Sequence, residues 1–508
     1  MTIDIQTIAI VGAGAMGRGI AQIAAQAGVL VRLYDTNADA VAAARESLRQ
    51  LWDKLSQKGK LTAEQADAAL ARVQPAGSLQ DLADCQLVIE AIVERLDIKR
   101  DLFSQLEAIV SADCILASNT SSLSITAIAA ACKQPQRVVG FHFFNPVALM
   151  KVVEVIDGLR SDPTAGDALA ALARRMGHTP VRAKDMPGFI VNHAGRGMNI
   201  EGLRVAQESV ASFSQIDAIM REQAGFRMGP FELMDLTALD VSHPVMESIY
   251  QQFYDEPRFR PSPITAVRLA GGLIGRKAGE GFYTYPEGQK QVPVEPPVPA
   301  AQAGLQVWIS PAHAEGNARA RVLLQALSAS IVDVAEPPEQ ALIIVTPLGE
   351  DVSTCAGQQQ LDASRTVGLD TLHALETGKR RTLMLSPATQ PAWRDAAHAL
   401  LASDGTPVSV IQDSPGFVAQ RIVAAIINVA CDIAQQGIAT PSDIDRAVTL
   451  GLGYPAGPLA MGDALGGARI LETLRNLQRV TGDMRYRPSL WLQRRVQLGL
   501  SLLAEPLA

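Results

Sequence analysis

The spacing of hydrophobic residues alternates between two patterns over the first 185 positions. Short apolar runs occupy residues 8–11, 29–34, 86–92 and 115–117. The segments between them carry apolar residues every three or four positions, as amphipathic helices do. Alternating strands and helices predict a mainly parallel sheet covered by helices. We therefore expect an α/β domain over residues 1–185.

A glycine-rich turn follows the first predicted strand and opens the first predicted helix. The turn consists of Gly12, Ala13, Gly14, Ala15, Met16 and Gly17. In such a turn the first glycine permits a tight bend, the second lets backbone amides approach a pyrophosphate, and the third lets the helix pack closely. Asp35 ends the second predicted strand, where a carboxylate binds a ribose 2′-hydroxyl and disfavours a 2′-phosphate. The pattern predicts a Rossmann domain that binds NAD, rather than a glycine-rich turn without a ligand.

Two polar residues interrupt apolar runs between residues 138 and 156. His142 follows an apolar run that begins at Val138, and Glu154 lies among valines. A buried carboxylate without a partner is costly, so Glu154 needs a partner or a chemical role. An imidazole held by that carboxylate would gain basicity at its free nitrogen, as proton abstraction near neutral pH requires. We consider the pair a candidate for the chemistry, although two unrelated, individually satisfied polar groups would give the same pattern.

Other polar residues gather where predicted strands end. Glu90 and Glu94 lie near the end of the strand at 86–92, and Lys99 follows in the next helical segment. Residues 118–122, Ser-Asn-Thr-Ser-Ser, follow the next strand. Ligands of open α/β sheets bind at the carboxyl ends of the strands, although at least one of these serines fits the N-cap of the following helix. These positions are therefore candidates for ligand contacts.

The composition favours a multidomain globular enzyme with small-molecule partners. The chain has 508 residues and a formal net charge of −7 without long basic blocks. This length predicts about three domains, and neither nucleic acid nor a polybasic membrane contact is expected. The five cysteines contain no CxxC pair, so we expect neither a disulfide framework nor a metal site. The first residues lack a basic targeting segment and no apolar run reaches membrane-spanning length, which predicts a cytoplasmic protein.

A long-range repeat accounts for the length of the chain. The block that begins at Asp185 recurs from Asp413, and we call the difference between these two positions (413 − 185) the repeat offset. The same offset continues without an insertion through later glycine, proline and aspartate positions. We expect two copies of a helical domain, at 186–290 and 413–508, packed as an intrachain pseudo-dimer about a pseudo-two-fold axis. This expectation requires an interface between the two copies, and pairing of whole chains stays open.

The segment between the two helical copies is predicted to hold a degenerate α/β domain over residues 305–412. Its strand-like runs alternate with helical patterns, and it has no GxGxxG turn, so we expect one NAD per chain. Residues 382–388 stand where a histidine-bearing strand is expected, so the second copy is predicted to have lost the chemistry. Residues 291–304 are proline-rich and predict an extended linker.

Six motifs, in this order, resemble the 3-hydroxyacyl-CoA dehydrogenase family. They are GAGAMG, EAIVE, SNTSSL, GFHFFNP, KVVEV and PGFIVN, and the resemblance extends to GRKAGEGFYTY at residues 275–285. It implies an NAD-dependent oxidation of an (S)-3-hydroxyacyl-CoA to the 3-oxoacyl-CoA. It also implies a Rossmann domain followed by a helical dehydrogenase domain, so the fold expected for the whole chain is α/β plus all-α.

The resemblance also implies roles for individual residues. It makes His142 the general base, Glu154 the residue that orients it, and Ser121 and Asn192 contacts of the substrate's 3-oxygen. Donors at that oxygen would stabilise its negative charge. The family positions that line the dinucleotide, or its junction with the substrate, are matched here by Glu94, Lys99, Asn145 and Lys277.

One position departs from the family pattern. Arginine is common after the asparagine of the PGFIVN motif, whereas here His193 stands in that place and Arg196 follows one turn later. We expect Arg196 to form a surface salt bridge. The alternative is that it contacts a carboxylate on the acyl chain of the substrate.

The longer form of the family resembles bacterial enzymes of aromatic-acid and fatty-acid breakdown, including the 3-hydroxyadipyl-CoA dehydrogenase of phenylacetate degradation. The alternatives are a short-chain 3-hydroxybutyryl-CoA dehydrogenase and a non-catalytic, NADH-binding relative of the crystallin type. A β-hydroxyacid dehydrogenase or imine reductase can share the glycine-rich start and a helical second domain. Such enzymes lack the HFFNP and KVVEV pair, which argues against that interpretation.

Overall fold

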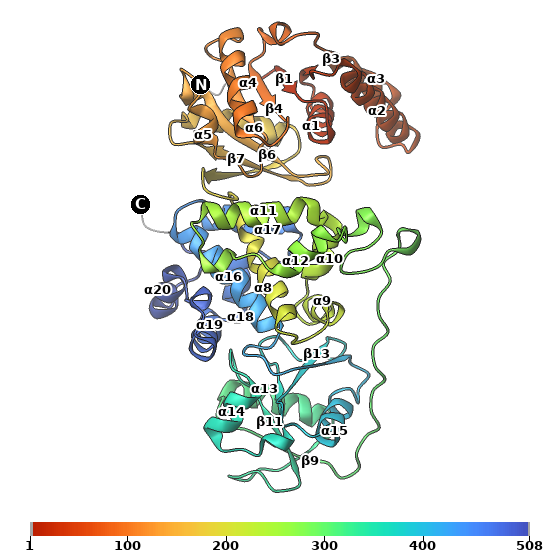
Figure 1. Ribbon diagram of the computed structural model, residues 1–508, viewed down its shortest axis with the longest axis vertical. Helices are drawn as coiled ribbons and strands as arrows, with labels where there is room; N and C mark the ends of the chain where they lie inside the picture. The colour runs from red at the N-terminus through yellow and green to blue at the C-terminus, as the bar shows by residue number, and fades with distance from the viewer. Residues whose placement is uncertain (1–3, 506–508) are drawn as a thin grey trace. The chain divides into compact units, whose positions relative to one another are not determined.

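The computed structural model describes residues 4–505, which fall into two compact units. The first unit holds the chain up to His193 together with Gln436–Leu452. The second unit holds Ala194–Gln435 and the chain from Gly453 onward. Each unit contains one sheet, and Figure 1 shows helices on both sides of each sheet. One segment of the second helical copy thus belongs to the first unit.

The first unit is built on an eight-stranded sheet with the order β3-β2-β1-β4-β5-β6-β7-β8. The strands are β1 (Thr7–Val11), β2 (Leu30–Tyr34), β3 (Val73–Pro75), β4 (Leu87–Glu90), β5 (Ile115–Ser118), β6 (Val138–Phe143), β7 (Val152–Asp157) and β8 (Thr179–Lys184). All neighbours are parallel except β6 and β7, which run antiparallel. This is the Rossmann-type sheet that the sequence predicts.

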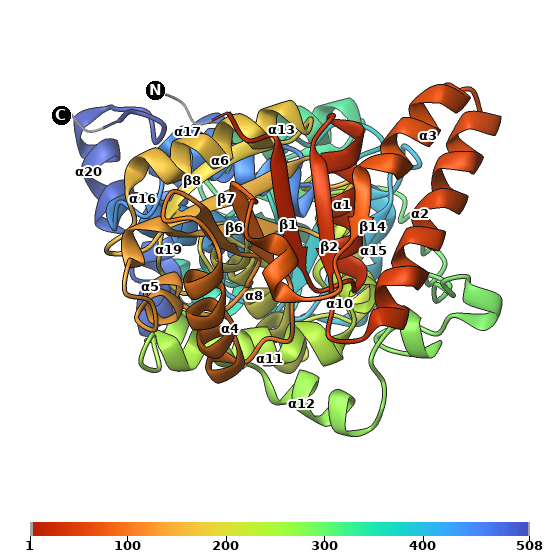
Figure 2. The same ribbon diagram turned by 90° about the horizontal axis from the view of Figure 1, so that it is seen from above.

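Helices pack around this sheet. They are α1 (Ala15–Gln26), α2 (Ala38–Gln57), α3 (Ala63–Arg72), α4 (Leu96–Ile109), α5 (Ile125–Ala129), α6 (Pro163–Arg175), the short α7 (Val191–Ala194) and α17 (Pro441–Leu452). Helices α2 and α3 run side by side as a hairpin beyond the edge of the sheet (Figure 2). The hairpin turns at Gly59, which has φ +66°, and α3 restarts with a capping box between Thr62 and Gln65.

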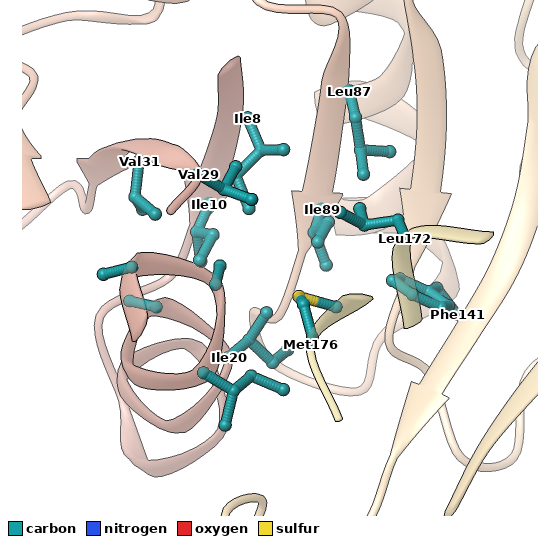
Figure 3. Close-up of a cluster of buried hydrophobic side chains, with 14 of the residues drawn as sticks. Ile8, Ile10, Ile20, Val29, Val31, Leu87, Ile89, Phe141, Leu172 and Met176 are labelled. Carbon is teal, nitrogen blue, oxygen red and sulfur yellow. The ribbon is translucent and has the colours of Figure 1, made fainter. Parts of the chain in front are cut away.

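Side chains along β6 and β7 point alternately into a hydrophobic core and to the opposite face of the sheet. Phe141 and Phe143 enter the core with Val153 and Val155, together with residues of α1 and α6 (Figure 3). His142 and Glu154 point to the other face, because neighbouring side chains along a strand alternate. The antiparallel register places these two residues directly opposite each other. The core therefore fixes the strands, and the register brings the two polar residues together.

The second unit contains two sets of helices. The first set is α8 (Arg196–Gln207), α9 (Phe213–Glu222), α10 (Pro230–Thr237), α11 (Leu239–Gln252) and α12 (Pro263–Ala270). The second set is α16 (Ala419–Gln435), α18 (Pro458–Leu465), α19 (Gly467–Thr481) and α20 (Leu490–Leu498). Helices α8 and α16 pack closely, and a Cβ on Gly197 would lie 2.7 Å from the Cα of Ile426. The two helical copies therefore share an interface inside this unit.

The second unit also contains a six-stranded sheet with the order β10-β9-β11-β12-β13-β14. Its strands are β9 (Gln306–Ile309), β10 (Ser330–Ile331), β11 (Ala341–Val345), β12 (Thr366–Leu369), β13 (Arg381–Leu385) and β14 (Val408–Ile411). Its helices are α13 (Ala314–Ala326), α14 (Val352–Gln359) and α15 (Pro391–Leu401). Strands β12 and β13 are antiparallel and the other neighbours are parallel. This sheet is the degenerate α/β domain that the sequence predicts.

The repeat begins earlier in the chain than Asp185. Helices α6 and α15 start at positions separated by the repeat offset, and so do strands β6 and β12. Asp185 accepts hydrogen bonds from the first backbone amides of α5, and Asp413 accepts the same bonds from α14. The duplication therefore extends into the α/β domains as well as the helical domains.

Candidate active site

The centre of the site is a buried pair formed by His142 and Glu154. The Nδ1 atom of His142 lies 2.6 Å from Oε2 of Glu154, and both side chains are at most 5% exposed. A carboxylate can only accept, so Nδ1 carries the proton and Nε2 keeps its lone pair. No hydrogen-bond partner of Nε2 is found among residues 4–505. The ring centroids of Phe144 and Phe189 lie 4.4 and 6.0 Å from the centroid of the imidazole, which is therefore in an apolar setting.

The second oxygen of Glu154 is held by the backbone. Its Oε1 accepts hydrogen bonds from the amides of Ile190 and Val191, both at 2.9 Å. These amides follow the Pro187-Gly188-Phe189 turn, where Phe189 has φ +49°. Three donors thus compensate a carboxylate that is fully buried. Sequence reasoning paired Glu154 with His142 and missed the two amides, because backbone donors carry no residue-type signal.

Ser121 and Asn192, the predicted contacts of the substrate oxygen, lie together. The Nδ2 atom of Asn192 donates to the carbonyl oxygen of Ser121 at 3.3 Å. Glu94 organises the loop that carries Ser121, because its Oε1 accepts bonds from the amides of Ser121 and Ser122 at 2.9 and 3.1 Å. Burial by itself would raise the pKa of Glu94, but the Lys99 ammonium and these donors lower it below its usual value. Glu94 is therefore an anchor for the serine loop.

Lys99 is also connected to this loop, through ion pairs with two glutamates. Its side chain is 1% exposed, and Nζ lies 2.5 Å from Glu90 and 3.3 Å from Glu94. Ser118 at the end of β5 donates to the other oxygen of Glu90 at 2.6 Å. Asn119, for which the sequence predicts no separate role, accepts a bond from the amide of Phe143 at 2.9 Å and so fastens the loop to β6. The polar cluster links the ends of β4, β5 and β6 into one frame.

The glycine-rich turn fits a bound dinucleotide. A Cβ on Gly12 would lie 2.5 Å from the Ala91 oxygen, and a Cβ on Gly17 would lie 1.8 Å from the Gly12 oxygen. The fold itself therefore excludes side chains at these two positions. A Cβ on Gly14 would meet no protein atom within 4 Å, so the space beside it is open. Gly14 is the N-cap of α1, and no side chain caps this end of the helix, which leaves amides for a pyrophosphate.

Asp35 lies beside the same turn. Its Oδ2 accepts a hydrogen bond from the amide of Ala13 at 2.8 Å, and Oδ1 accepts from the amide of Asn37 at 3.0 Å. The half-buried carboxylate is thus fixed next to the nucleotide turn, as ribose recognition requires. Of the other predicted cofactor contacts, Ala15 and Asn145 are exposed and Met16 is half-buried. Lys277 belongs to the second unit, where it is exposed and forms an ion pair with Asp240 at 2.7 Å.

The second α/β domain keeps a polar network at the positions equivalent to the pair. Asp370 is the repeat equivalent of His142; it stands at the end of β12, and its amide donates to the Thr382 carbonyl. The carboxylate of Asp370 accepts bonds from Gln223 and Gln420, both at 2.9 Å. Gln420 in turn accepts from the amide of Gly349. The histidine-bearing strand is therefore replaced by β12 and not by residues 382–388, which correspond to the glutamate-bearing strand.

The two copies differ at the position that follows the asparagine of the PGFIVN motif. His193 is fully buried in the first copy, and the second copy has Arg421 at the equivalent position. Arg421 is 1% exposed and bonds to Glu201 and Glu208 at 2.8 and 2.6 Å. Arg196 is 6% exposed, so the expectation of a surface salt bridge was wrong. Burial lowers the pKa of Arg196 to about 10, against the effect of Tyr454.

Comparison with known families agrees with this geometry. Residues 7–186 match the family described as 3-hydroxyacyl-CoA dehydrogenase, NAD binding domain. The C-terminal domain of the same family matches twice, at residues 188–285 and 416–502. The second match confirms the duplicated helical domain. Among the described residues, none of the helices has the length and apolarity to cross a membrane.

Several known proteins are similar over long stretches. The 3-hydroxyadipyl-CoA dehydrogenase of Escherichia coli (strain K12) is 38% identical over 498 residues, which are 98% of this chain and 99% of that protein. A probable 3-hydroxybutyryl-CoA dehydrogenase of Deinococcus radiodurans is 42% identical, over 54% of this chain and 99% of its own length. The crystal structure of 3-hydroxybutyryl-CoA dehydrogenase from Escherichia coli K12 superposes with a TM-score of 0.85 at 36% identity, covering 98% and 99% of the two chains. The chain therefore belongs to the 3-hydroxyacyl-CoA dehydrogenase family and is an NAD-dependent oxidoreductase.

Proposed function

We propose that His142 is the general base in the oxidation of an (S)-3-hydroxyacyl-CoA to the 3-oxoacyl-CoA. The single observation that carries this proposal is the buried hydrogen bond between His142 Nδ1 and Glu154. It fixes the tautomer in which Nε2 is basic, so that Nε2 takes the proton of the 3-hydroxyl group. A bound NAD would supply the acceptor for the hydride that leaves C3 of the substrate.

Glu154 stabilises the imidazolium that forms when His142 takes the proton. Because the Ile190 and Val191 amides hold its other oxygen, the carboxylate stays in place in both protonation states of the histidine. A fully buried carboxylate beside the ring also strengthens the attraction, since little solvent screens it. Glu154 is therefore the orienting and stabilising residue of the pair.

Ser121 and Asn192 are proposed to contact the 3-oxygen of the substrate. The Ser121 hydroxyl lies on the loop anchored by Glu94. Asn192, with its side-chain amide, is the residue directly after Val191, whose backbone amide binds Glu154. Both groups are thus attached to the frame that holds the general base. Donors placed there would stabilise negative charge on the oxygen as the proton leaves. Gly14, the amides of the glycine turn and Asp35 are proposed to hold the cofactor, with Glu94, Lys99, Asn145 and Lys277 nearby in the bound state.

For the substrate, we propose a dicarboxylic acyl-CoA, 3-hydroxyadipyl-CoA, with a short-chain 3-hydroxybutyryl-CoA as the alternative. The relative of matching length is named for the first substrate, whereas the crystal structure and the half-length relatives are named for the second. The 38% identity to the full-length relative named for 3-hydroxyadipyl-CoA supports the first assignment. We propose that the reaction belongs to aromatic-acid breakdown and takes place in the cytoplasm, where the five free cysteines would stay reduced.

The test is the loss of NADH absorbance with 3-oxoadipyl-CoA and, in parallel, with acetoacetyl-CoA. We expect a higher kcat/KM with 3-oxoadipyl-CoA. A preference for acetoacetyl-CoA would favour the short-chain alternative and overturn the dicarboxylic assignment. Binding of NADH without turnover of either thioester would overturn the proposed role of His142.

We further propose that the helical domains form an intrachain pseudo-dimer. Three contacts support this arrangement. Gly197 of α8 lies against Ile426 of α16, so equivalent helices face each other. In the second unit, the amide of Gln412 donates to the carbonyl of Val210; in the first unit, the equivalent amide of Lys184 donates to the equivalent carbonyl of Ile438. Light scattering measures whether whole chains pair again, which the intrachain pairing leaves open.

A further inference from the structure

Helix α17 comes from the second helical copy but forms part of the first unit. It packs on β7 and β8, the strands that follow the catalytic histidine in the chain. Two hydrogen bonds fasten it there. The amide of Lys184 donates to the Ile438 carbonyl at 2.8 Å, and the amide of Arg182 donates to Asp443 at 3.3 Å. The appended half of the chain therefore contributes a helix to the domain that carries His142 and Glu154.

Gly451, near the end of α17, lies against the residues that support Glu154. A Cβ at this position would lie 3.0 and 3.1 Å from the two methyl carbons of Val191 and 3.5 Å from a methyl carbon of Val152. Val191 and Val152 are at most 1% exposed and so have little room to move. The backbone amide of Val191 is one of the two donors to Glu154. A side chain at position 451 would therefore press on Val191, the residue whose amide holds the Glu154 carboxylate.

The equivalent position in the other copy shows what a side chain does there. Gln223 is the repeat equivalent of Gly451 and stands directly after α9, the helix equivalent to α17. Its amide nitrogen donates to Asp370 at 2.9 Å, and its oxygen accepts a bond from the Thr382 hydroxyl at 2.5 Å. Asp370 and Thr382 occupy the positions of His142 and Glu154. In the copy without catalytic residues, a side chain from this position thus reaches the centre of the site.

We infer that Gly451 is a positioning residue for the proposed dehydrogenase reaction. It acts from the appended half of the chain by leaving the Val191 amide free to hold Glu154 and by leaving the space beside the pair unfilled. This inference rests on the proposed function, because it assigns Gly451 to the support of the proposed general base. The backbone at Gly451 is helical and not left-handed, so the absence of a Cβ serves packing and not backbone conformation.

The experiment compares Gly451→Ala and Gly451→Gln with the wild-type enzyme. We expect Gly451→Ala to lower kcat about 10-fold and Gly451→Gln about 100-fold or more, since small displacements of a catalytic group are costly. The dissociation constant for NADH is expected to stay within about twofold, because the glycine turn is not touched. Measured in the direction of 3-hydroxyacyl-CoA oxidation by NAD, the acid limb of the kcat/KM profile of Gly451→Ala is expected to move to higher pH, because a carboxylate with loosened amide bonds attracts the imidazolium proton more strongly.

Gly357→Ala is the matched control. Gly357 also lies in a helix, α14, but it is exposed and a Cβ there would meet no atom within 4 Å. Its activity and pH profile are expected to match those of the wild type. Val191→Ala provides a rescue, because removing the methyl groups makes room for the added Cβ. The double variant Gly451→Ala/Val191→Ala is expected to reach a kcat within about threefold of Val191→Ala alone.

The outcomes separate this inference from the proposed function. If the wild type and the control turn over 3-oxoacyl-CoA and the folded Gly451→Gln variant keeps kcat within about twofold, the positioning role of Gly451 is overturned. If kcat falls but the pH profile is unchanged and Val191→Ala gives no rescue, Gly451 serves stability alone and the inference again fails. If the wild type itself has no activity, the proposed function fails first, and the comparison of variants shows this directly.

Discussion

Asp370 occupies in the second α/β domain the position that His142 occupies in the first. The two residues lie at equivalent places of the repeat, and each faces the antiparallel strand that carries its partner. His142 faces Glu154, whereas Asp370 faces Thr382 and is bonded by two glutamines. One copy therefore presents a basic nitrogen, and the other presents a carboxylate that already accepts hydrogen bonds. The same architecture gives a candidate catalytic pair in one copy and a closed hydrogen-bond network in the other.

The interaction between His142 and Glu154 predicts a large effect of Glu154→Gln. The new amide would donate to Nδ1 and move the ring proton to Nε2, so the basic nitrogen would be lost. We expect kcat to fall about 100-fold or more while NADH still binds. Steady-state rates and NADH fluorescence titration measure the two properties. The control is Glu46→Gln, at a half-exposed position on α2; a matching loss in both variants would contradict the role of Glu154.

Replacement of Asp35 by Ser is expected to change cofactor selection. The carboxylate beside the Ala13 amide disfavours a 2′-phosphate, and a hydroxyl group would not. We expect the ratio of kcat/KM for NADH over NADPH to fall by about 10-fold or more, because one charge repulsion and one ribose hydrogen bond are lost. Initial rates with both cofactors provide the measurement. An unchanged ratio would show that another residue selects the cofactor.

Removal of the Arg421 side chain is expected to destabilise the second unit. Arg421→Met removes the guanidinium that binds the buried Glu201 and leaves that carboxylate with the more distant Arg485 at 3.8 Å, and loss of such a buried partner costs about 3–5 kcal/mol. Burial opposes the charge of Arg421, but Tyr486 and the two glutamates hold its pKa well above the usual value. Urea unfolding measures the change. Arg394→Ala, which removes an exposed ion pair with Asp395, is the control and should cost less than about 1 kcal/mol.

Asp217 predicts a pH dependence of stability. Burial raises its pKa to about 7, although Tyr283 and two backbone amides donate to the carboxylate. The folded protein therefore holds this proton to higher pH than the unfolded chain, whose value is 3.8. The stability that the proton gives is fully present below that value and is lost as the pH rises through about 7.

The comparison of wild type with Asp217→Asn isolates this effect, because the variant cannot titrate. Between about pH 4 and pH 8, we expect the wild type to lose about 4 kcal/mol more unfolding free energy than the variant, from about three pKa units at roughly 1.36 kcal/mol each. Urea unfolding midpoints across this range give the measurement. Parallel curves for the two proteins would show that Asp217 does not titrate there.

Much of the fold followed from local patterns in the sequence. Apolar runs predicted most strands of both sheets, because a strand buried on both faces needs an unbroken apolar sequence, but they did not reveal β3, β8 or β12. The glycine turn and Asp35 predicted the nucleotide site, because tight turns and close backbone approach tolerate few residue types. The constant repeat offset revealed the duplicated helical domain, which the family comparison confirmed. The helical pattern between the predicted strands at 29–34 and 86–92 became a hairpin of two helices, α2 and α3, since Gly59 and the capping box at Thr62 interrupt it.

The sequence by itself determined which residues are candidates for the chemistry, since a histidine and a glutamate inside apolar strands stand out by type. Tertiary structure decided which groups they meet. The amides of Ile190 and Val191 that hold Glu154 are backbone atoms, and any residue except proline would supply them. The packing of α17 on β7 and β8 brings Gly451 close to the strand that carries Glu154 from a distant part of the chain. Contacts of this kind form only when distant segments of the chain pack together in the folded protein, so no local pattern of residues encodes them.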